Sequence, residues 1–270
     1  MIVIDTKQKP NFKGVQLKPP TQAEFDKYID IWNKKYNKYN HEAILDGVFK
    51  KWNSDTDVLC MYIRCIMLDK FYGTNIKYID ELVHHLLSIK DLHKRIHAGD
   101  LDVIDEMQKV KKPNGKYIHY RSFVSKYCRR YNPQAYPIYD SIVKEVLEYY
   151  VNTTKFYTGK QPIDWKNYKV FKDVVDQFIK AYPFVKNYIM LDRYLWTMGK
   201  EKIEGIRLYN QIQTAKNTTD PVKQAKKLDE IRNKLNMPNA TVQDLEDAVE
   251  NIYFYYLNRR KPTRNPYEKH

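Results

Sequence analysis

The sequence has few of the residues that would indicate cross-links or membrane insertion. Its three cysteines, Cys60, Cys65 and Cys128, form neither an even-numbered set nor a metal-binding spacing. The most apolar stretch, 58–68, has about 11 residues and carries Arg64, so it is too short and too polar to span a bilayer. The N-terminus MIVIDTKQKP lacks the basic region and long apolar run of a signal peptide. We therefore expect a cytoplasmic protein without disulfides that does not enter a membrane.

Signatures of bound cofactors are also missing. With only eight glycines, the sequence holds no Walker loop and no Rossmann glycine fingerprint. His93 and His97 lie four residues apart, but Lys94 follows the first histidine where a metalloprotease helix has glutamate. We predict neither a metal nor an organic cofactor.

Positive charge is abundant. The chain of 270 residues carries 47 Lys and Arg against 33 Asp and Glu, a net charge of +14, while 43% of the residues are hydrophobic. The hydrophobic share is enough for a packed core. A charge surplus of this size favours a polyanionic partner, nucleic acid ahead of an anionic membrane. The alternative is a charge that serves solubility alone.

Apolar residues recur at helical spacing through most of the chain, and no alternating strand pattern persists, so we predict an all-α fold. The segment 58–72 is apolar on almost every face, which is typical of a buried central helix ending at Gly73. Pro113, Asn114 and Gly115 predict a turn. We expect further helices over 21–39, 42–52, 76–87, 90–98, 101–110, 165–182, 189–198, 202–216, 221–235 and 242–258.

The character of the chain changes after Gly199, where the helices become polar and rich in lysine. We therefore predict a helical core over 1–204, a C-terminal helical extension over 205–258 and a basic tail over 259–270. No internal repeat is visible. The role of the extension is left open.

The segment 120–143, YRSFVSKYCRRYNPQAYPIYDSIV, brings an amine and a carboxylate together. A helix carries Lys126, a break at Asn132 and Pro133 and a proline turn follow, and Asp140 opens a second helix. A lysine is a nucleophile when neutral, and a carboxylate can balance a positively charged sugar or activate water. The ordinary alternatives are a solvated lysine and an aspartate that only caps its helix.

Three motifs in this order resemble the helix-hairpin-helix DNA glycosylase superfamily, in particular its 8-oxoguanine glycosylase branch. The run 122–126 (SFVSK) stands where the family has a Gly-hydrophobic-Gly-Thr-Lys turn, and 136–140 (YPIYD) stands at its Val-Pro-Val-Asp turn. Upstream, 68–76 (LDKFYGTNI) resembles the family's Leu-Leu-Gln-Gln-Thr-Gln-Val segment, and downstream 191–196 (LDRYLW) resembles a late core helix. The resemblance covers roughly 40–204.

The resemblance implies a glycosylase-like helical core and an enzyme that turns a modified base out of duplex DNA and excises it. Lys126 would attack the sugar C1′ atom to form a Schiff base, which permits strand cleavage, and Asp140 would stabilise positive charge and move protons. In a milder version, Asp140 guides water and Lys126 only contacts the backbone. The sequence departs from the family at Ser122 and Val124, which replace two glycines, and in its shorter Lys–Asp spacing. It also has no four-cysteine iron–sulfur loop.

The resemblance and the charge together suggest residues that would contact DNA or the base. Asn75 would fill the gap left by the flipped base, and Tyr72 would wedge between bases; as alternatives, Asn75 is a turn residue and Tyr72 is core. Expected DNA contacts further include Lys116, Arg121, Ser122, Ser125, Arg129 and Arg130. Expected stacking residues of a base pocket, with core as their alternative, are Tyr136, Tyr139 and Trp196.

We thus expect a monomeric DNA glycosylase acting on a modified base in double-stranded DNA, in repair or in defence against modified phage DNA. One alternative is a DNA-binding or scaffold protein that keeps the fold without the chemistry. Another is an RNA-binding helical module, which gives no role to Asp140.

Overall fold

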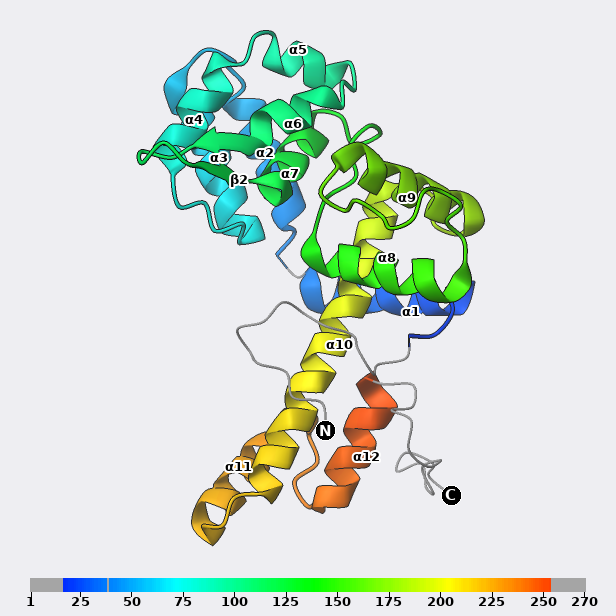
Figure 1. Ribbon diagram of the computed structural model, residues 1–270. Helices are drawn as coiled ribbons and strands as arrows, with labels where there is room; N and C mark the ends of the chain where they lie inside the picture. Colours follow the sequence, from blue (N-terminus) through cyan, green and yellow to red (C-terminus); the bar gives the residue numbers. More distant parts are fainter. Residues whose placement is uncertain (1–16, 38, 254–270) are drawn as a thin grey trace. The chain divides into compact units, whose positions relative to one another are not determined.

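The computed structural model describes residues 17–37 and 39–253. It is 67% helical, which confirms the all-α prediction (Figure 1). The helices are α1 (Gln22–Ile31), the π-helical turn η1 (Trp32–Tyr36), α2 (His41–Lys51), α3 (Val58–Tyr72), α4 (Ile79–Ser88), α5 (Leu92–His97), α6 (Asp102–Gln108), α7 (Arg121–Tyr131), α8 (Ser141–Thr154), α9 (Tyr168–Ala181), α10 (Tyr188–Lys216), α11 (Pro221–Leu235) and α12 (Val242–Tyr253).

Local signals fix several helix ends where the sequence predicted them. Asp57 caps α3 by accepting from the N–H groups of Leu59 and Cys60, and Gly73 ends α3 in the left-handed conformation, with φ of 59°. Asp220 caps α11 in the same way as Asp57 caps α3. No described helix has the length and apolar character needed to cross a membrane.

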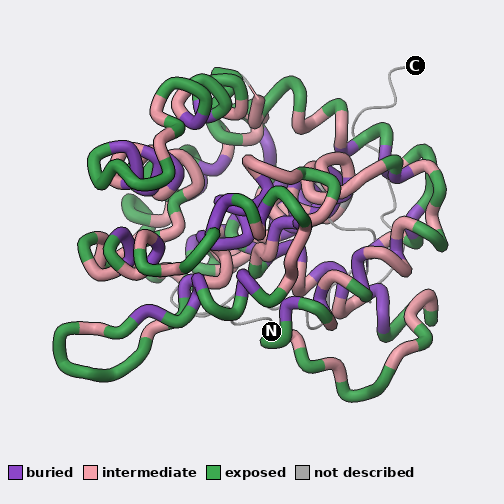
Figure 2. Tube along the Cα trace, turned by 90° about the horizontal axis from the view of Figure 1, so that it is seen from above, coloured by how far each residue is buried: buried purple, intermediate pink, exposed green. Residues whose placement is uncertain are grey.

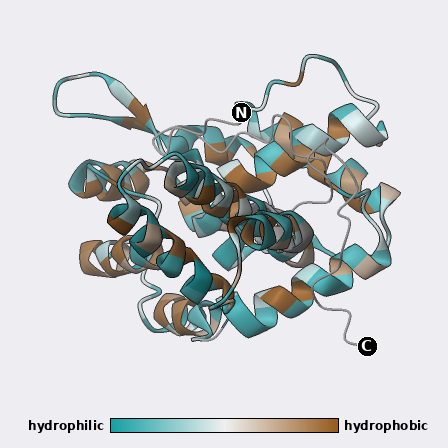
Figure 3. Ribbon diagram, turned by 90° about the horizontal axis from the view of Figure 1, so that it is seen from below, coloured by the Kyte–Doolittle hydropathy of each residue, from teal (hydrophilic) through white to brown (hydrophobic). Residues whose placement is uncertain are grey.

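Two short strands were not expected. β1 (Lys109–Lys111) and β2 (Tyr117–His119) pair antiparallel, with Val110 opposite Ile118, around the predicted turn. Each strand has three residues, too few for an alternation of polar and apolar residues to stand out in the sequence. The hairpin projects from the helices as a largely hydrophilic arm (Figure 3).

Two predicted helices, 189–198 and 202–216, are one helix of 29 residues, α10. Gly199 lies inside it and does not end it. A glycine within a helix costs about 1 kcal/mol relative to alanine, a cost that burial of the neighbouring Leu195 and Met198 offsets. The first predicted helix also differs, because it ends at Tyr36 through η1 instead of reaching Tyr39.

The chain divides into two compact units, 21–196 and 1–20 with 197–270, which we call the large and the small unit. The division falls inside α10. The predicted boundary at 204 stays a prediction, and the predicted tail, 259–270, lies outside the described residues.

The large unit is built around α3 and α7. Helices α2, α4 and α7 pack against α3, and α5 and α6 pack against α7. Buried residues gather on the inner faces of the helices (Figure 2). The apolar face of α7 includes Phe123, Val124, Tyr127 and Cys128, all at most 1% exposed. Close packing of these side chains fixes the position of the helix and therefore the direction in which its polar residues project.

The small unit has a core of its own in its described part. Ile212 of α10, Ile231 of α11 and Val249 of α12 are buried. Gln213 donates a hydrogen bond to Glu246 of α12, and Lys216 pairs with the same carboxylate at 3.2 Å.

Candidate active site

Lys126 and Asp140 meet at the junction of α7 and α8. The Nζ atom of Lys126 lies 3.5 Å from Oδ2 of Asp140, and the Lys126 side chain is 5% exposed. The other carboxylate oxygen of Asp140 accepts from the backbone N–H of Ile142 at 2.8 Å and so caps α8. The expected pairing of amine and carboxylate is present in the geometry.

Two serines on α7 hold this pair in place. Lys126 Nζ donates to Ser122 Oγ at 2.6 Å. Ser125 Oγ accepts from the backbone N–H of Tyr139 at 2.9 Å and donates to the carbonyl of Ser122. Because Tyr139 directly precedes Asp140, Ser125 fixes the turn that delivers the carboxylate to Lys126. Ser125 is fully buried, so it has a structural position and does not face DNA.

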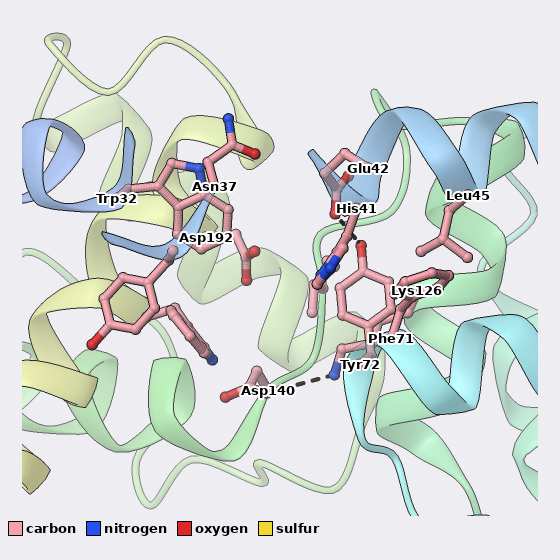
Figure 4. A pocket seen from close by; sticks show the side chains of 13 residues that line it. Trp32, Asn37, His41, Glu42, Leu45, Phe71, Tyr72, Lys126, Asp140 and Asp192 are labelled. Carbon is pink, nitrogen blue, oxygen red and sulfur yellow. Dashed lines mark hydrogen bonds and ion pairs between the residues drawn. The ribbon is translucent and has the colours of Figure 1, made fainter. Parts of the chain in front are cut away.

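A cavity of about 170 Å³ opens beside the pair, wholly within the large unit. Figure 4 shows its side chains converging from separate elements, with Lys126 and Tyr72 on one side and Trp32 and Asp192 on the other. Much of the wall is aromatic, with Trp196 edge-on to Trp32 at 5.6 Å and to Tyr36 at 5.0 Å. The cavity is lined by Trp32, Tyr36, Asn37, His41, Glu42, Leu45, Phe71, Tyr72, Lys126, Ile138, Asp140, Asp192 and Trp196.

A charged network closes one side of the cavity. Glu42 of α2 lies 3.2 Å from the Arg129 guanidinium and 2.8 Å from that of Arg130. Tyr72 donates to Glu42 at 2.6 Å and accepts from both arginines, at 3.0 and 2.6 Å. Burial disfavours the charged form of Glu42, but the two guanidinium groups and the Tyr72 hydroxyl outweigh it and hold the pKa below its usual value. Burial raises the pKa of Tyr72 well above its usual range.

This network changes the interpretation of three predicted DNA contacts. Arg129 and Arg130 face Glu42 and Tyr72, and Arg130 also pairs with Asp46 at 2.6 Å, so their guanidinium groups are engaged within the large unit. Tyr72 uses its hydroxyl in three hydrogen bonds and lines the cavity, which does not leave it free to wedge between bases.

Asp192 is a second carboxylate of the cavity. It is half-buried on α10, and no other described residue forms a hydrogen bond or ion pair with its carboxylate. Burial raises its pKa to about 7; Arg129 and Lys126 work against this shift, while Asp140 adds to it. A carboxyl group poised near neutrality in a cavity is a feature of functional sites.

The predicted stacking residues divide into two groups. Trp196 lines the cavity, as expected. Tyr136 is fully buried and donates to the carbonyl of Asp100, so it belongs to the core. Tyr139 lies outside the lining and packs edge-on to Phe171 at 4.9 Å.

The segment 122–126, which stands where the resembling family has its glycine turn, lies inside α7. The N–H of Val124 donates to the carbonyl of Tyr120 at 2.9 Å and is therefore not open to a phosphate. The Ser122 hydroxyl is also engaged, because it accepts a hydrogen bond from the Lys126 amine. The helix forms here because neither Ser122 nor Val124 has the freedom of the glycines that they replace.

Of three further predicted contacts, Asn75 and Lys116 are exposed and Arg121 is half-buried. Asn75 is exposed in the left-handed conformation, with φ of 58°, and donates to the carbonyl of Gly73, as a turn residue does. Lys116 is exposed on the hairpin. Arg121 lies over the Tyr139 ring at 5.2 Å and forms no ion pair with any other described residue.

Several residues that line the cavity were not predicted from the sequence. Glu42 looks like an ordinary first-turn acid of α2, and His41 like its neighbour. Asp192 carries one usable signal, since it is an acid inside the apolar run 191–196. Among residues 17–37 and 39–253, no group of three or more His, Cys, Asp or Glu is arranged to hold a metal ion.

Comparison with known proteins gives similarity without a function. The family model HI_0787_N, described as an N-terminal domain, matches residues 24–135. An uncharacterized protein of Haemophilus influenzae is 43% identical over 130 residues, which is 48% of this chain and 61% of that protein. The chain thus covers about three fifths of the length of this curated relative. No solved structure matches the chain significantly.

Proposed function

We propose that the protein is a DNA glycosylase-like enzyme that excises a modified base, with Lys126 as nucleophile and Asp140 as its partner. The observation that carries the proposal is the nearly buried Lys126 amine, 3.5 Å from a carboxylate in an aromatic-walled cavity. Convergent ionisable groups in a cavity with an apolar wall are the usual mark of an active site.

The cavity suits a single base. A water needs about 10–15 Å³ of such space, so a cavity of about 170 Å³ holds roughly the number of non-hydrogen atoms in a purine. Trp32 and Trp196 offer aromatic surface on which a flat base can stack. A base pulled from the duplex would bring its sugar to the mouth of the cavity, near Lys126.

The chemistry follows from the pair. The lone pair of the Lys126 nitrogen attacks the sugar C1′ atom, and the bond from C1′ to the base breaks, with its electron pair staying on the departing base. Asp140 accepts the proton that the attacking nitrogen loses and balances the positive charge that develops on the sugar. Opening of the sugar ring then leaves a Schiff base on Lys126, which permits cleavage of the strand.

The proposal that DNA is the partner is supported by the net charge and by three individual side chains. The net charge of +14 favours a polyanion. Lys116 on the projecting hairpin and Arg121 at the start of α7 can contact phosphates, while Asn75 can reach toward the gap in the duplex. The three free, buried cysteines are consistent with a reducing compartment, so we propose a cytoplasmic location. We further propose that the enzyme is a monomer and that it acts in repair or in defence against modified phage DNA.

Borohydride trapping tests the proposal. The protein is mixed with duplex oligonucleotides that carry uracil, 8-oxoguanine, 5-hydroxymethyluracil, 7-methylguanine or an abasic site, and the adducts are resolved by gel. We expect a covalent adduct that Lys126→Gln abolishes. Lys172→Gln is the matched control, because Lys172 also forms an ion pair with an aspartate, Asp176, and is half-buried outside the cavity.

The other outcomes are informative. Base release without an adduct, if it depends on Asp140, would indicate the milder mechanism in which Asp140 guides water. Neither adduct nor release, together with DNA binding that Lys126→Gln leaves unchanged, would reject the enzyme in favour of a non-catalytic DNA-binding protein.

A further inference from the structure

Asp192 is the one carboxylate of the cavity that no described side chain neutralises through a hydrogen bond or ion pair. The other two are occupied, because Glu42 is bound by Arg129 and Arg130 and Asp140 caps α8 beside Lys126. Figure 4 shows the Asp192 carboxylate directed into the open space, across from Lys126. A polar group placed in this way is free to contact whatever occupies the cavity.

We propose that Asp192 is a further catalytic residue, which donates a proton to the departing base. The inference rests on the proposed function and assigns a second chemical role within the same cavity. Lys126 and Asp140 act at the sugar, whereas Asp192 faces the part of the cavity where the base would lie.

The bond between C1′ and the base nitrogen breaks, and its electron pair stays on the base. The carboxyl proton of Asp192 passes to an acceptor atom of the base, which leaves as a neutral molecule, and Asp192 becomes a carboxylate. The Lys126 nitrogen forms the new bond to C1′ and gives its proton to Asp140.

Burial keeps the proton of Asp192 available near neutral pH. Its pKa of about 7 reflects burial first, opposed by the cations of α7 and supported by neighbouring acids. The titratable and charged groups that share its surroundings are Lys126 and Arg129 on α7, His41 and Glu42 on α2, Tyr72 on α3, and Asp140 at the start of α8.

The test separates base departure from sugar chemistry. Trapping on a preformed abasic site requires Lys126 but no departing base, so Asp192→Asn should trap within about twofold of the unmodified protein. Release of a neutral base such as 8-oxoguanine or uracil should fall by about 100-fold or more, the usual contribution of a positioned proton donor. Release of 7-methylguanine, which is already cationic, should fall by less than about tenfold.

Asp192→Glu is the second variant, and it should restore part of the release of neutral bases because it keeps a carboxyl group. Release by the unmodified protein should decline as pH rises through about 7, a decline that Asp192→Asn should lack. The inference is wrong if Asp192→Asn affects neutral and cationic bases equally, leaves release unchanged or abolishes abasic-site trapping. If the unmodified protein gives neither adduct nor release, the proposed function fails first and this inference fails with it.

Discussion

The Lys126 amine lies 3.5 Å from one oxygen of Asp140 while the other oxygen caps α8. One side chain thus serves both the helix and the pair. Asp140→Asn keeps the cap, since asparagine caps as well as aspartate, whereas Asp140→Ala removes it. We expect both variants to lose base release by at least about 100-fold. Urea denaturation should show Asp140→Ala less stable than Asp140→Asn by about 1 kcal/mol, and equal stabilities would contradict the capping role.

Glu42 is expected to be important for stability. Glu42→Gln leaves Arg129 and Arg130 facing each other without a charge between them and should lower the free energy of unfolding at pH 7 by about 3 kcal/mol. The control is Asp46→Asn, because Asp46 pairs with the same Arg130 but is 69% exposed, and it should cost under about 1 kcal/mol.

The stabilisation that the Glu42 carboxylate gives the folded protein should decrease as the pH falls. The folded-state pKa is below the usual 4.5, so the unfolded state binds more protons in acid and the stabilisation is present above pH 4.5. It is lost as pH falls through the folded pKa. The gap between the unmodified protein and Glu42→Gln should therefore narrow below pH 4.5, and a gap that widens there would overturn this assignment.

Ser125 should be needed for the geometry of the site. Ser125→Ala leaves the part-buried N–H of Tyr139 without its acceptor, which should lower the free energy of unfolding by about 1–3 kcal/mol, measured by thermal or chemical denaturation. Ser88→Ala is the matched control, since Ser88 is exposed and donates only to the carbonyl of His85; it should change stability by less than about 0.5 kcal/mol. A similar loss in both variants would argue against a special role for Ser125.

Ionisation of Asp192 should lower the free energy of unfolding at alkaline pH. Its pKa is raised from the usual 3.8 to about 7, so the folded state binds more protons and stability falls as pH rises through this range. We expect Asp192→Asn to be more stable than the unmodified protein at pH 8, by on the order of 1 kcal/mol once solvent screening in the cavity is allowed for. The difference should vanish near pH 3.5, which denaturation at both pH values measures without any substrate.

DNA binding should depend on Lys116 and Arg121 through charge. Each alanine variant should weaken binding to any duplex and reduce the slope of log affinity against log salt by about 0.9. Lys160→Ala, which removes an exposed lysine before α9, is the control and should leave the slope unchanged. Fluorescence anisotropy at several salt concentrations measures the DNA affinity of each variant. An unchanged slope for both alanine variants would mean that neither Lys116 nor Arg121 contacts phosphate.

The sequence was sufficient to predict Lys126 and Asp140 as a pair because local signals position them. Asp140 is a helix cap, the proline turn precedes it, and the apolar stripe of α7 sets the side from which Lys126 projects. The helical class followed from periodicity in the same way. Neither conclusion required knowledge of contacts distant in the sequence.

Residues placed by distant contacts were not predictable. Glu42 reaches the site only because α2 packs near α7, 88 residues away from Arg130. Asp192 lies in a helix that the sequence predicted, 189–198, but its place in the cavity depends on how α10 packs against residues far away in the sequence. The partners of Arg129 and Arg130 were not predictable for the same reason, since tertiary packing and not spacing brings Glu42 to them.

Tyr72 has a consequence for the shape of the site. Its hydroxyl donates once and accepts twice, which uses the full hydrogen-bonding capacity of a phenol. The ring cannot swing without breaking all three bonds at once. Tyr72 therefore links α3 to α7, and we expect it to keep the spacing of these two helices, which form one wall of the cavity, unchanged when a ligand binds.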